Sequence, residues 1–360
     1  MSQFEDLSGE ILMAIFEYMN VEDVWTIFFN MNSRFNSLVF DARLRLTADV
    51  SKIDKSNFDQ FCSSLISTNF NNIFTLILSN NYYRYPQIRS FLSQTTLSNF
   101  QSLHALTLVD INHDELIEVT QQVKQLPLLT YFNVNTHEIF RDKELASATK
   151  ALLSQSDIRV SVINLHEKLQ WPDSETISSC NAEVLFLDFI NADRLFQLLT
   201  HCPSLRSLSV TLDSRHSAAI ATTPAASDEV PYTSLPLIPF THITYLRLCF
   251  RPFNTSVLDR LLLSVPSVRR FSVETLVYNT DYIRSPYWTA LLQKQLPALE
   301  RVRLVIRGWF VSKTSQNADE KVDASQIIDG YRYDRYWLDR AHKRMFHYHL
   351  DSQTAVLTVR

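Results

Sequence analysis

Four stretches of the chain repeat one phrase: QLPLLTYFNV at 125–134, HCPSLRSLSV at 201–210, SVPSVRRFSV at 264–273 and QLPALERVRL at 295–304. In each stretch a proline and one further residue precede the pattern apolar-x-x-apolar-x-apolar. Alternation of this kind is typical of a strand with one buried face, and a helical pattern precedes each proline. Because proline cannot continue a helix, the phrase predicts a helix, a break and then a strand.

Proline-free versions of the phrase lie between these copies. They begin at Ile73, Leu103, Val184 and Ile243, and weaker versions begin at 158 and 182. Most of the spacings are near the period of about 20–29 residues that leucine-rich repeats show, and the pattern resembles that family. Such repeats stack into a solenoid with a parallel sheet on one side and helices on the other. We therefore expect an α/β fold with an irregular leucine-rich-repeat-like solenoid over 46–311. An ordinary doubly wound α/β sheet is the alternative.

Two stretches interrupt the period. Residues 213–239 are small, polar and proline-rich, and residues 312–329 are polar, so both are expected to be exposed loops. In the final segment, 330–360, a helical stretch precedes a region where Phe346, Tyr348 and Leu350 alternate with polar residues. We expect a C-terminal helix and a hairpin that caps the last repeat, because terminal repeats must cover their core.

The first 45 residues have a different pattern, which predicts three short helices. Ser8 is placed to cap the first helix, and Asn32 or Ser33 to cap the third. Asn20 and Asp23 are spaced like a capping box for the second. The apolar stripe of the first helix is predicted at Ile11, Leu12, Ile15, Phe16 and Met19, and that of the second at Val21, Val24, Trp25, Ile27, Phe28 and Met31. A unit this small and this apolar needs a neighbour in the chain and a second protein, or it serves as a helical cap.

The N-terminal stretch resembles an F-box. The matching residues are Leu7, Glu10-Ile11-Leu12, Ile15-Phe16, Tyr18-Met19, Glu22-Asp23-Val24 and Asn32-Ser33-Arg34-Phe35, with Ser8 where the family has proline. The resemblance implies a subunit that binds the Skp adaptor of a cullin-containing ubiquitin ligase and holds a target protein with its repeats. It assigns adaptor binding to the apolar helix residues Leu7, Ile11, Leu12, Ile15, Phe16, Val24 and Phe28.

The open face of the predicted sheet is the expected site for the target, because alternate strand residues point away from the helices. The positions chosen are Tyr131, Arg247, Arg270, Arg301 and Arg303. Arginine is frequent there only in the later repeats, which favours an acidic partner surface. Solvated arginines paired with Glu274 and Glu300 are the alternative. A binding scaffold outside any ligase is the second functional hypothesis.

Composition excludes several other classes. The chain has 360 residues but only three glycines, so glycine-rich nucleotide and phosphate loops and the nucleophile elbow cannot be built. We expect no enzymatic activity, no cofactor and no metal; His347 and His349 have no complete ligand set around them. The net charge of −4 argues against nucleic acid as the partner.

The remaining features concern location. The four cysteines have no paired spacing, so reduced thiols and a cytoplasmic or nuclear location are expected. No signal peptide is recognisable at the N-terminus. The uncharged stretch 60–83 contains many Ser and Asn residues, so no membrane span is expected.

Overall fold

The computed structural model forms two compact units, unit 1 over Met1–Ala182 and unit 2 over Glu183–Arg360. The predicted loops at 213–239 and 312–329 and the predicted helix after residue 330 lie largely outside the described residues. The structure describes residues 4–53, 58–59, 62–63, 72–80, 86–136, 151–155, 157–165, 179–213, 238–251, 254–277, 282, 284–309, 329–331, 333, 346–350 and 354–359.

Unit 1 begins with the predicted helices and continues into a sheet in which β1 to β5 pair in parallel and in sequence order. Its elements are η1 (Phe4–Asp6), α1 (Gly9–Glu17), α2 (Val21–Phe28), α3 (Ser33–Val39), β1 (Leu46–Asp49), η2 (Val50–Lys52), β2 (Ile73–Ser79), α5 (Gln87–Gln94), η4 (Leu97–Asn99), β3 (Ala105–Val109), α6 (His113–Val123), β4 (Tyr131–Thr136) and β5 (Val160–Leu165).

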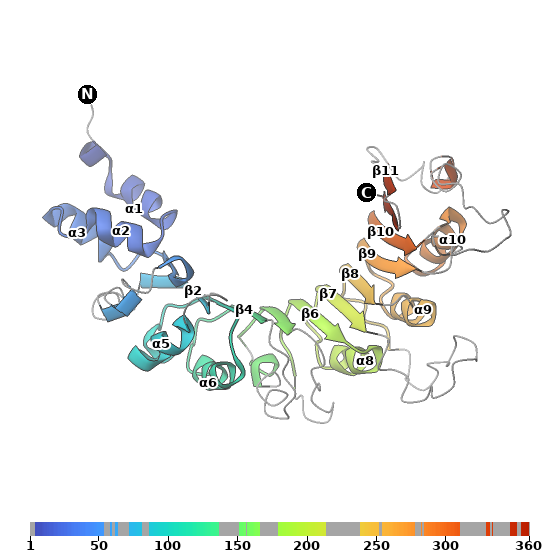
Figure 1. The fold of residues 1–360 in the computed structure, drawn as a ribbon, viewed down its shortest axis with the longest axis horizontal. Helices are drawn as coiled ribbons and strands as arrows, with labels where there is room; N and C mark the ends of the chain where they lie inside the picture. Colours follow the sequence, from blue (N-terminus) through green and yellow to red (C-terminus); the bar gives the residue numbers. More distant parts are fainter. Residues whose placement is uncertain are drawn as a thin grey trace. The chain divides into compact units, whose positions relative to one another are not determined.

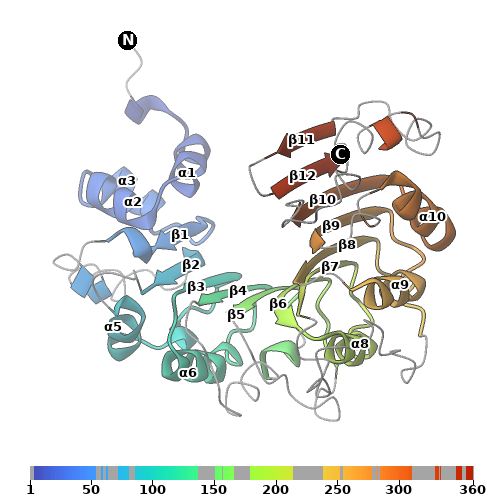
Figure 2. The same cartoon turned by 45° about the vertical axis from the view of Figure 1, so that its right-hand side comes forward.

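Unit 2 contains a second parallel run, β6 to β10, again in sequence order. An antiparallel hairpin follows, and its strand β12 pairs with the edge of β10 (Figure 2). The elements are β6 (Val184–Ile190), α8 (Ala192–Thr200), β7 (Ser207–Asp213), β8 (Tyr245–Arg251), α9 (Thr255–Ser264), β9 (Arg270–Val277), α10 (Ser285–Gln295), β10 (Arg301–Trp309), β11 (Phe346–Leu350) and β12 (Thr354–Val359).

The helices lie on one face of the strands in each unit. Helices α5 and α6 cover one face in unit 1, and α8, α9 and α10 cover one face in unit 2 (Figure 1). Strand residues therefore alternate between buried and accessible, as in β4 and β8. The expected α/β class with a parallel sheet is confirmed. A doubly wound sheet reverses its strand order at a switch point, and neither unit does so.

The repeated phrase forms a tight turn before each strand. The proline does not end the helix directly. For example, two residues, His201 and Cys202, separate Pro203 from Thr200, the last residue of α8. It instead occupies the second position of a four-residue turn, where its fixed φ is favourable. In each turn the fourth residue donates its N–H to the carbonyl of the first. These pairs are Leu129 to Leu126, Leu205 to Cys202, Val268 to Val265 and Leu299 to Leu296, and the proline-free turns pair Leu103 with Phe100 and Ile243 with Phe240.

Both ends of every turn point into the core. All the residues paired in these turns are at most 6% exposed, so each turn places two apolar side chains beneath the start of a strand. Burial of each such side chain contributes about 1.5–3 kcal/mol. Each of the strands β3 to β10 begins two residues after the predicted first apolar position of its phrase. The short strand β1 was not predicted.

Backbone carbonyls just before the strands set the register from one repeat to the next. The carbonyl of His104 accepts the N–H groups of both Thr130 and Tyr131, and that of Thr130 accepts from Arg159 and Val160. Unit 2 has the same arrangement. The carbonyls of Glu183, Arg206, Thr244 and Arg269 each accept the two N–H groups that begin the next strand. Equivalent residues of neighbouring repeats therefore lie side by side.

Asparagine side chains begin the helices that follow strands. The Oδ1 atoms of Asn112, Asn191 and Asn254 accept the N–H three residues later, at the starts of α6, α8 and α9. Such caps contribute about 1 kcal/mol each. With few glycines in the chain, the residues with positive φ are Asn30, Asp110 and Phe189 among those described.

The fully buried carboxylate of Glu115 joins three elements of unit 1. Its Oε2 accepts a hydrogen bond from Asn80 Nδ2 at 2.7 Å and from the Asn112 N–H at 3.2 Å. The Asn80 Oδ1 in turn accepts from the N–H of Ile88 in α5. Glu115 thus connects the end of β2 with the first turns of α5 and α6.

Asn20 joins the N-terminal helices to the sheet. Its Nδ2 donates to the Asp49 carbonyl at 3.2 Å, and its Oδ1 accepts the Asp49 N–H at 2.9 Å. The side-chain amide therefore pairs with the edge of β1 as a strand would. The capping box predicted with Asp23 is wrong, because α2 has no side-chain cap and the Asn20 amide is used for Asp49 instead.

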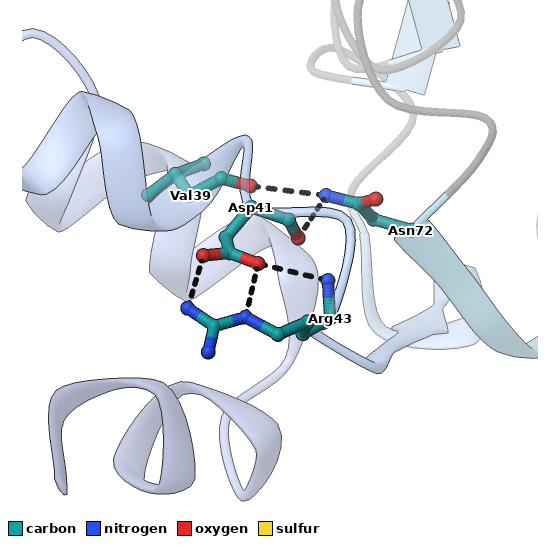
Figure 3. Close-up of polar contacts among 4 residues, drawn as sticks. All are labelled: Val39, Asp41, Arg43 and Asn72. Atoms are coloured by element: carbon teal, nitrogen blue, oxygen red, sulfur yellow. Dashed lines mark hydrogen bonds and ion pairs between the residues drawn. The ribbon is translucent and has the colours of Figure 1, made fainter. Parts of the chain in front are cut away.

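A second junction ties the end of α3 to β2 (Figure 3). The Nδ2 of Asn72, a buried residue, donates to the carbonyls of Val39 at 3.3 Å and Asp41 at 3.1 Å. The Asp41 carboxylate accepts from the Arg43 N–H, Nε and Nη2 groups. These hydrogen bonds from Arg43 lower the pKa of Asp41 to about 2.

We expect Asn20→Ala to free the helices from β1 without unfolding the sheet. Two hydrogen bonds are lost and the Asp49 N–H is left without its partner, at a cost of about 1–3 kcal/mol. Native-state hydrogen exchange should then show faster exchange at Asp49, with β3 and β4 unchanged. Asn20→Asp keeps the acceptor oxygen, so its exchange rate at Asp49 should lie between those of the wild type and of Asn20→Ala. Equal protection of Asp49 in all three proteins would contradict this role.

We expect the carboxyl of Asp41 to titrate near pH 2 in carbon-detected NMR. Its folded-state pKa lies below the ordinary value, so its contribution to stability is present above about pH 4 and lost as the pH falls through 2. Arg43→Gln should return the pKa toward 3.8. Arg43→Lys keeps the charge without the fork geometry and should give an intermediate value. An unchanged titration in the Gln variant would exclude Arg43 as the cause.

Candidate interaction surfaces

A cluster of phenylalanine rings forms the interior of the N-terminal helices. Phe16 lies 4.6 Å from Phe28, and Phe28 lies 5.3 Å from Phe35, measured between ring centroids. Phe4, from η1, stacks on Phe28 at 5.8 Å and on Phe35 at 6.2 Å. Aromatic pairs at these separations contribute about 0.5–1.5 kcal/mol each beyond the area they bury. This cluster holds α1, α2 and α3 together.

The predicted adaptor-binding residues divide between this core and the surface. Leu12, Phe16, Val24 and Phe28 are buried in the helical unit itself, so their side chains cannot form the outer part of an interface. Leu7 and Ile15 are half-buried, whereas Ile11 is 50% exposed. The buried stripe of α1 is Leu12, Met13 and Phe16 rather than the wider predicted set.

The helices also expose apolar side chains that the fold does not cover. Most of the exposed large apolar residues in the described part of the chain lie here: Phe4, Ile11, Tyr18, Ile27, Met31 and Phe40. Beside them Trp25 stacks on Phe29 at 3.8 Å, and the ring of Phe40 contacts both edge-on. We call these residues the helical apolar surface. Contiguous apolar patches mark protein-binding sites, and in this surface the rings of Trp25, Phe29 and Phe40 lie together.

Arg34 fixes the chain that leads into α1. Its guanidinium donates to the backbone carbonyls of Glu5 and Leu7. The Ser8 Oγ accepts the Ile11 N–H and caps α1, as predicted, and Asn32 caps α3 by accepting the Phe35 N–H at 2.9 Å. The polar residues of the N-terminal pattern therefore order the segment that precedes α1.

The open face of β3, β4 and β5 in unit 1 carries uncharged side chains. Thr107, Tyr131 and Asn133 are half-buried and lie side by side on β3 and β4. Val160 and Val162 continue these rows on β5. Tyr131, which was predicted to contact a target, is therefore on the face without helices, but no charged side chain of these three strands accompanies it.

The open face of unit 2 carries the predicted arginines. The register places Tyr245, Arg270 and Arg301 in one row and Arg247, Ser272 and Arg303 in the next. All four arginines are exposed. We call this group, on β8, β9 and β10, the arginine surface.

Only part of the arginine surface is neutralised by acidic side chains. Arg247 lies 3.9 Å from Glu274, and the neighbouring Arg269, just before β9, lies 3.3 Å from Glu300. Among the described residues Arg270, Arg301 and Arg303 form no ion pair. Of the four arginines, pairing with Glu274 or Glu300 therefore accounts for Arg247 alone, and the other three are exposed to solvent.

The described side chains include no group of three His, Cys, Asp or Glu residues arranged to hold a metal. The four cysteines form no disulfide with one another, and burial raises the pKa of Cys62 to about 12, which disfavours its reactive thiolate form. The described helices include none long and apolar enough to span a bilayer. His347 and His349 lie on β11, and their side chains are outside the described residues.

Neither the models of known protein families nor the curated proteins compared with this chain match it.

We expect Phe16→Asp and Ile11→Asp to behave differently. Phe16 is fully buried, so the aspartate would leave an unpaired charge in the phenylalanine cluster and melt the helices. Ile11 is half-exposed and should tolerate the charge within about 0.5 kcal/mol. Near-ultraviolet circular dichroism and hydrogen exchange over residues 9–39 measure this. Equal loss of protection in both variants would show that Ile11 belongs to the core.

Proposed function

We propose that this chain is a substrate receptor of a Skp–cullin–F-box ubiquitin ligase. The N-terminal helices dock on the Skp adaptor, which joins the chain to cullin, and the repeats hold a target protein. The chain supplies binding and not chemistry, so ubiquitin transfer depends on bringing the target close to the ligase. It acts without a cofactor, in the cytoplasm or nucleus.

The helical apolar surface carries this proposal. Leaving apolar side chains in water forgoes about 25 cal/mol per Å², so a partner that covers Ile11, Ile27, Met31 and Phe40 gains that energy. The F-box pattern runs through the same segment, where Arg34 orders the approach to α1 and Asn32 caps α3. Together these features favour an adaptor-binding site over an apolar patch that has no partner.

The repeats support the second half of the proposal. We interpret the strands in sequence order, with helices on one face, as an irregular leucine-rich-repeat-like solenoid. Its open face presents side chains of many repeats at regular spacing, which suits a target-binding surface. Tyr131 and the arginine surface are the residues we assign to the target.

A protein-binding scaffold outside any ligase is the second candidate. The F-box resemblance assigns adaptor binding to Leu12, Phe16, Val24 and Phe28, but these four residues are buried within the helical unit. Their burial favours the scaffold. It is also favoured by Ser8, which caps α1 at the place where the family has proline. In this alternative the helices only cover the β1 edge of the sheet.

Adaptor binding separates the two candidates. Purified full chain should bind immobilised Skp adaptor, and Ile11→Asp together with Ile27→Asp should weaken binding about 100-fold or more. Burying uncompensated charges in an apolar interface costs several kcal/mol, and each 1.4 kcal/mol is a factor of ten.

Leu263→Asp is the matched control. Leu263 lies on α9 of unit 2 and is 50% exposed, as are Ile11 and Ile27, so the substitution alters similar accessible apolar area away from the helices. It should leave adaptor binding unchanged. Absence of binding by the wild-type chain, or equal binding by the Ile11/Ile27 variant, would reject the ligase assignment and favour the scaffold.

A further inference from the structure

The open face of unit 2 changes in character from one strand to the next. On β6 the accessible positions include Val184 and Phe186, which are half-buried and apolar. On β7 they are the small residues Ser207, Ser209 and Thr211. On β8, β9 and β10 they include Tyr245 and the arginine surface. An apolar strip, a strip of small residues and a basic strip therefore lie in order across the strands.

A bulge in β6 enlarges the apolar strip. The pairing with β7 shifts between Leu187 and Ile190, and Phe189 adopts a φ of 50°, where a bulky side chain is strained. Arg251, from β8, lies over the Phe189 ring at 5.6 Å. Bulges often re-aim side chains at functional sites, and strain of about 1–3 kcal/mol persists only where surrounding contacts hold it.

The basic strip holds like charges close together. Arg270 and Arg301 are direct register partners on neighbouring strands, which lie about 4.8 Å apart, and Arg303 follows on the same face. Like charges directly opposite each other destabilise a sheet. An anionic partner would relieve this repulsion, and carboxylates match the planar fork of arginine.

We infer that this face binds an extended acidic segment of the target that begins with an apolar side chain. The inference rests on the proposed function and adds the chemistry of the target. The apolar side chain lies over Ser207 and Ser209 against Phe186, and two or more carboxylates pair with Arg270, Arg301 and Arg303. The segment crosses the strands from β7 toward β10.

Strand spacing sets the separation of the two features. From β7 to β9 or β10 is two or three strand spacings, about 10–14 Å. An extended peptide advances about 3.3 Å per residue. The first carboxylate therefore follows the apolar residue by about three or four positions.

A peptide fits this face better than a nucleic-acid strand. A polynucleotide carries charge at every phosphate, but the arginines are confined to β8, β9 and β10. Asp188 on β6 lies on the same face and would repel the phosphates of a strand that continued toward β6, the end of the face where the proposed peptide places its uncharged apolar residue. The whole chain has a net charge of −4.

Selection from a random twelve-residue peptide library on the immobilised full chain tests the inference without the adaptor. The expected consensus has an apolar residue followed, about three or four positions later, by two acidic residues. A fluorescent peptide of that consensus should bind less tightly as salt is raised, because exposed charge pairs are screened. Arg270→Glu with Arg301→Glu should weaken its binding about tenfold or more.

The controls separate charge from fold and this surface from the helices. The variant Arg89→Glu, which changes an exposed residue of α5 in unit 1, should bind the peptide as the wild type does. Phe186→Ser should weaken the binding of peptides that carry the apolar residue. It should not change the binding of a peptide that lacks this residue. Ile11→Asp with Ile27→Asp should not alter peptide binding, so loss of adaptor binding leaves this result independent.

Three results would overturn the inference. The first is a selection that yields no consensus, or a consensus without acidic residues. The second is peptide binding that survives Arg270→Glu with Arg301→Glu in a folded protein. The third is tighter binding of labelled oligouridine than of the peptide.

Discussion

The open face of the strands in each unit depends on the hydrogen bonds that set one strand against the next. A single carbonyl before each strand accepts the two N–H groups that begin its neighbour, as His104 does for Thr130 and Tyr131. A slip of one residue would turn every side chain to the opposite face. The buried pair in each turn, such as Cys202 and Leu205, resists such a slip because it would have to leave the core. The rows of arginine on β8 to β10 exist only because this register is kept.

The helical unit relies on a different principle, in which side chains imitate the backbone. Asn20 gives the edge of β1 the donor and acceptor of a neighbouring strand, and Asn72 satisfies the carbonyls at the end of α3. Amides serve both purposes because they carry a donor and an acceptor on one planar group. The unit can therefore adjoin the sheet without contributing a strand. The residues of the helical apolar surface stay exposed.

The sequence predicted the parallel strands and the helices between them well because the signal is redundant. Leu205, Leu208 and Val210 alternate in the way that Leu129, Phe132 and Val134 do, so a single aberrant copy does not hide the pattern. It predicted the helical apolar surface poorly. Helices α1 and α2 are apolar nearly all round, so periodicity could not separate buried Phe16 from exposed Ile11. The role of Asn20 and the bulge at Phe189 were out of reach, since the first depends on Asp49 and the second on a conformation that phenylalanine disfavours.

The hairpin of β11 and β12 has a consequence for how the protein can change in length. Strand β12 runs antiparallel to β10 and occupies the hydrogen-bonding groups that another parallel strand would need. A duplicated repeat placed after β10 would have to displace it. Gene duplication in unit 2 can therefore add strands only ahead of β10, within the part of the face that carries Phe186, the small residues of β7 and the arginines. Growth of the array in this unit therefore changes the face that we propose to bind the target.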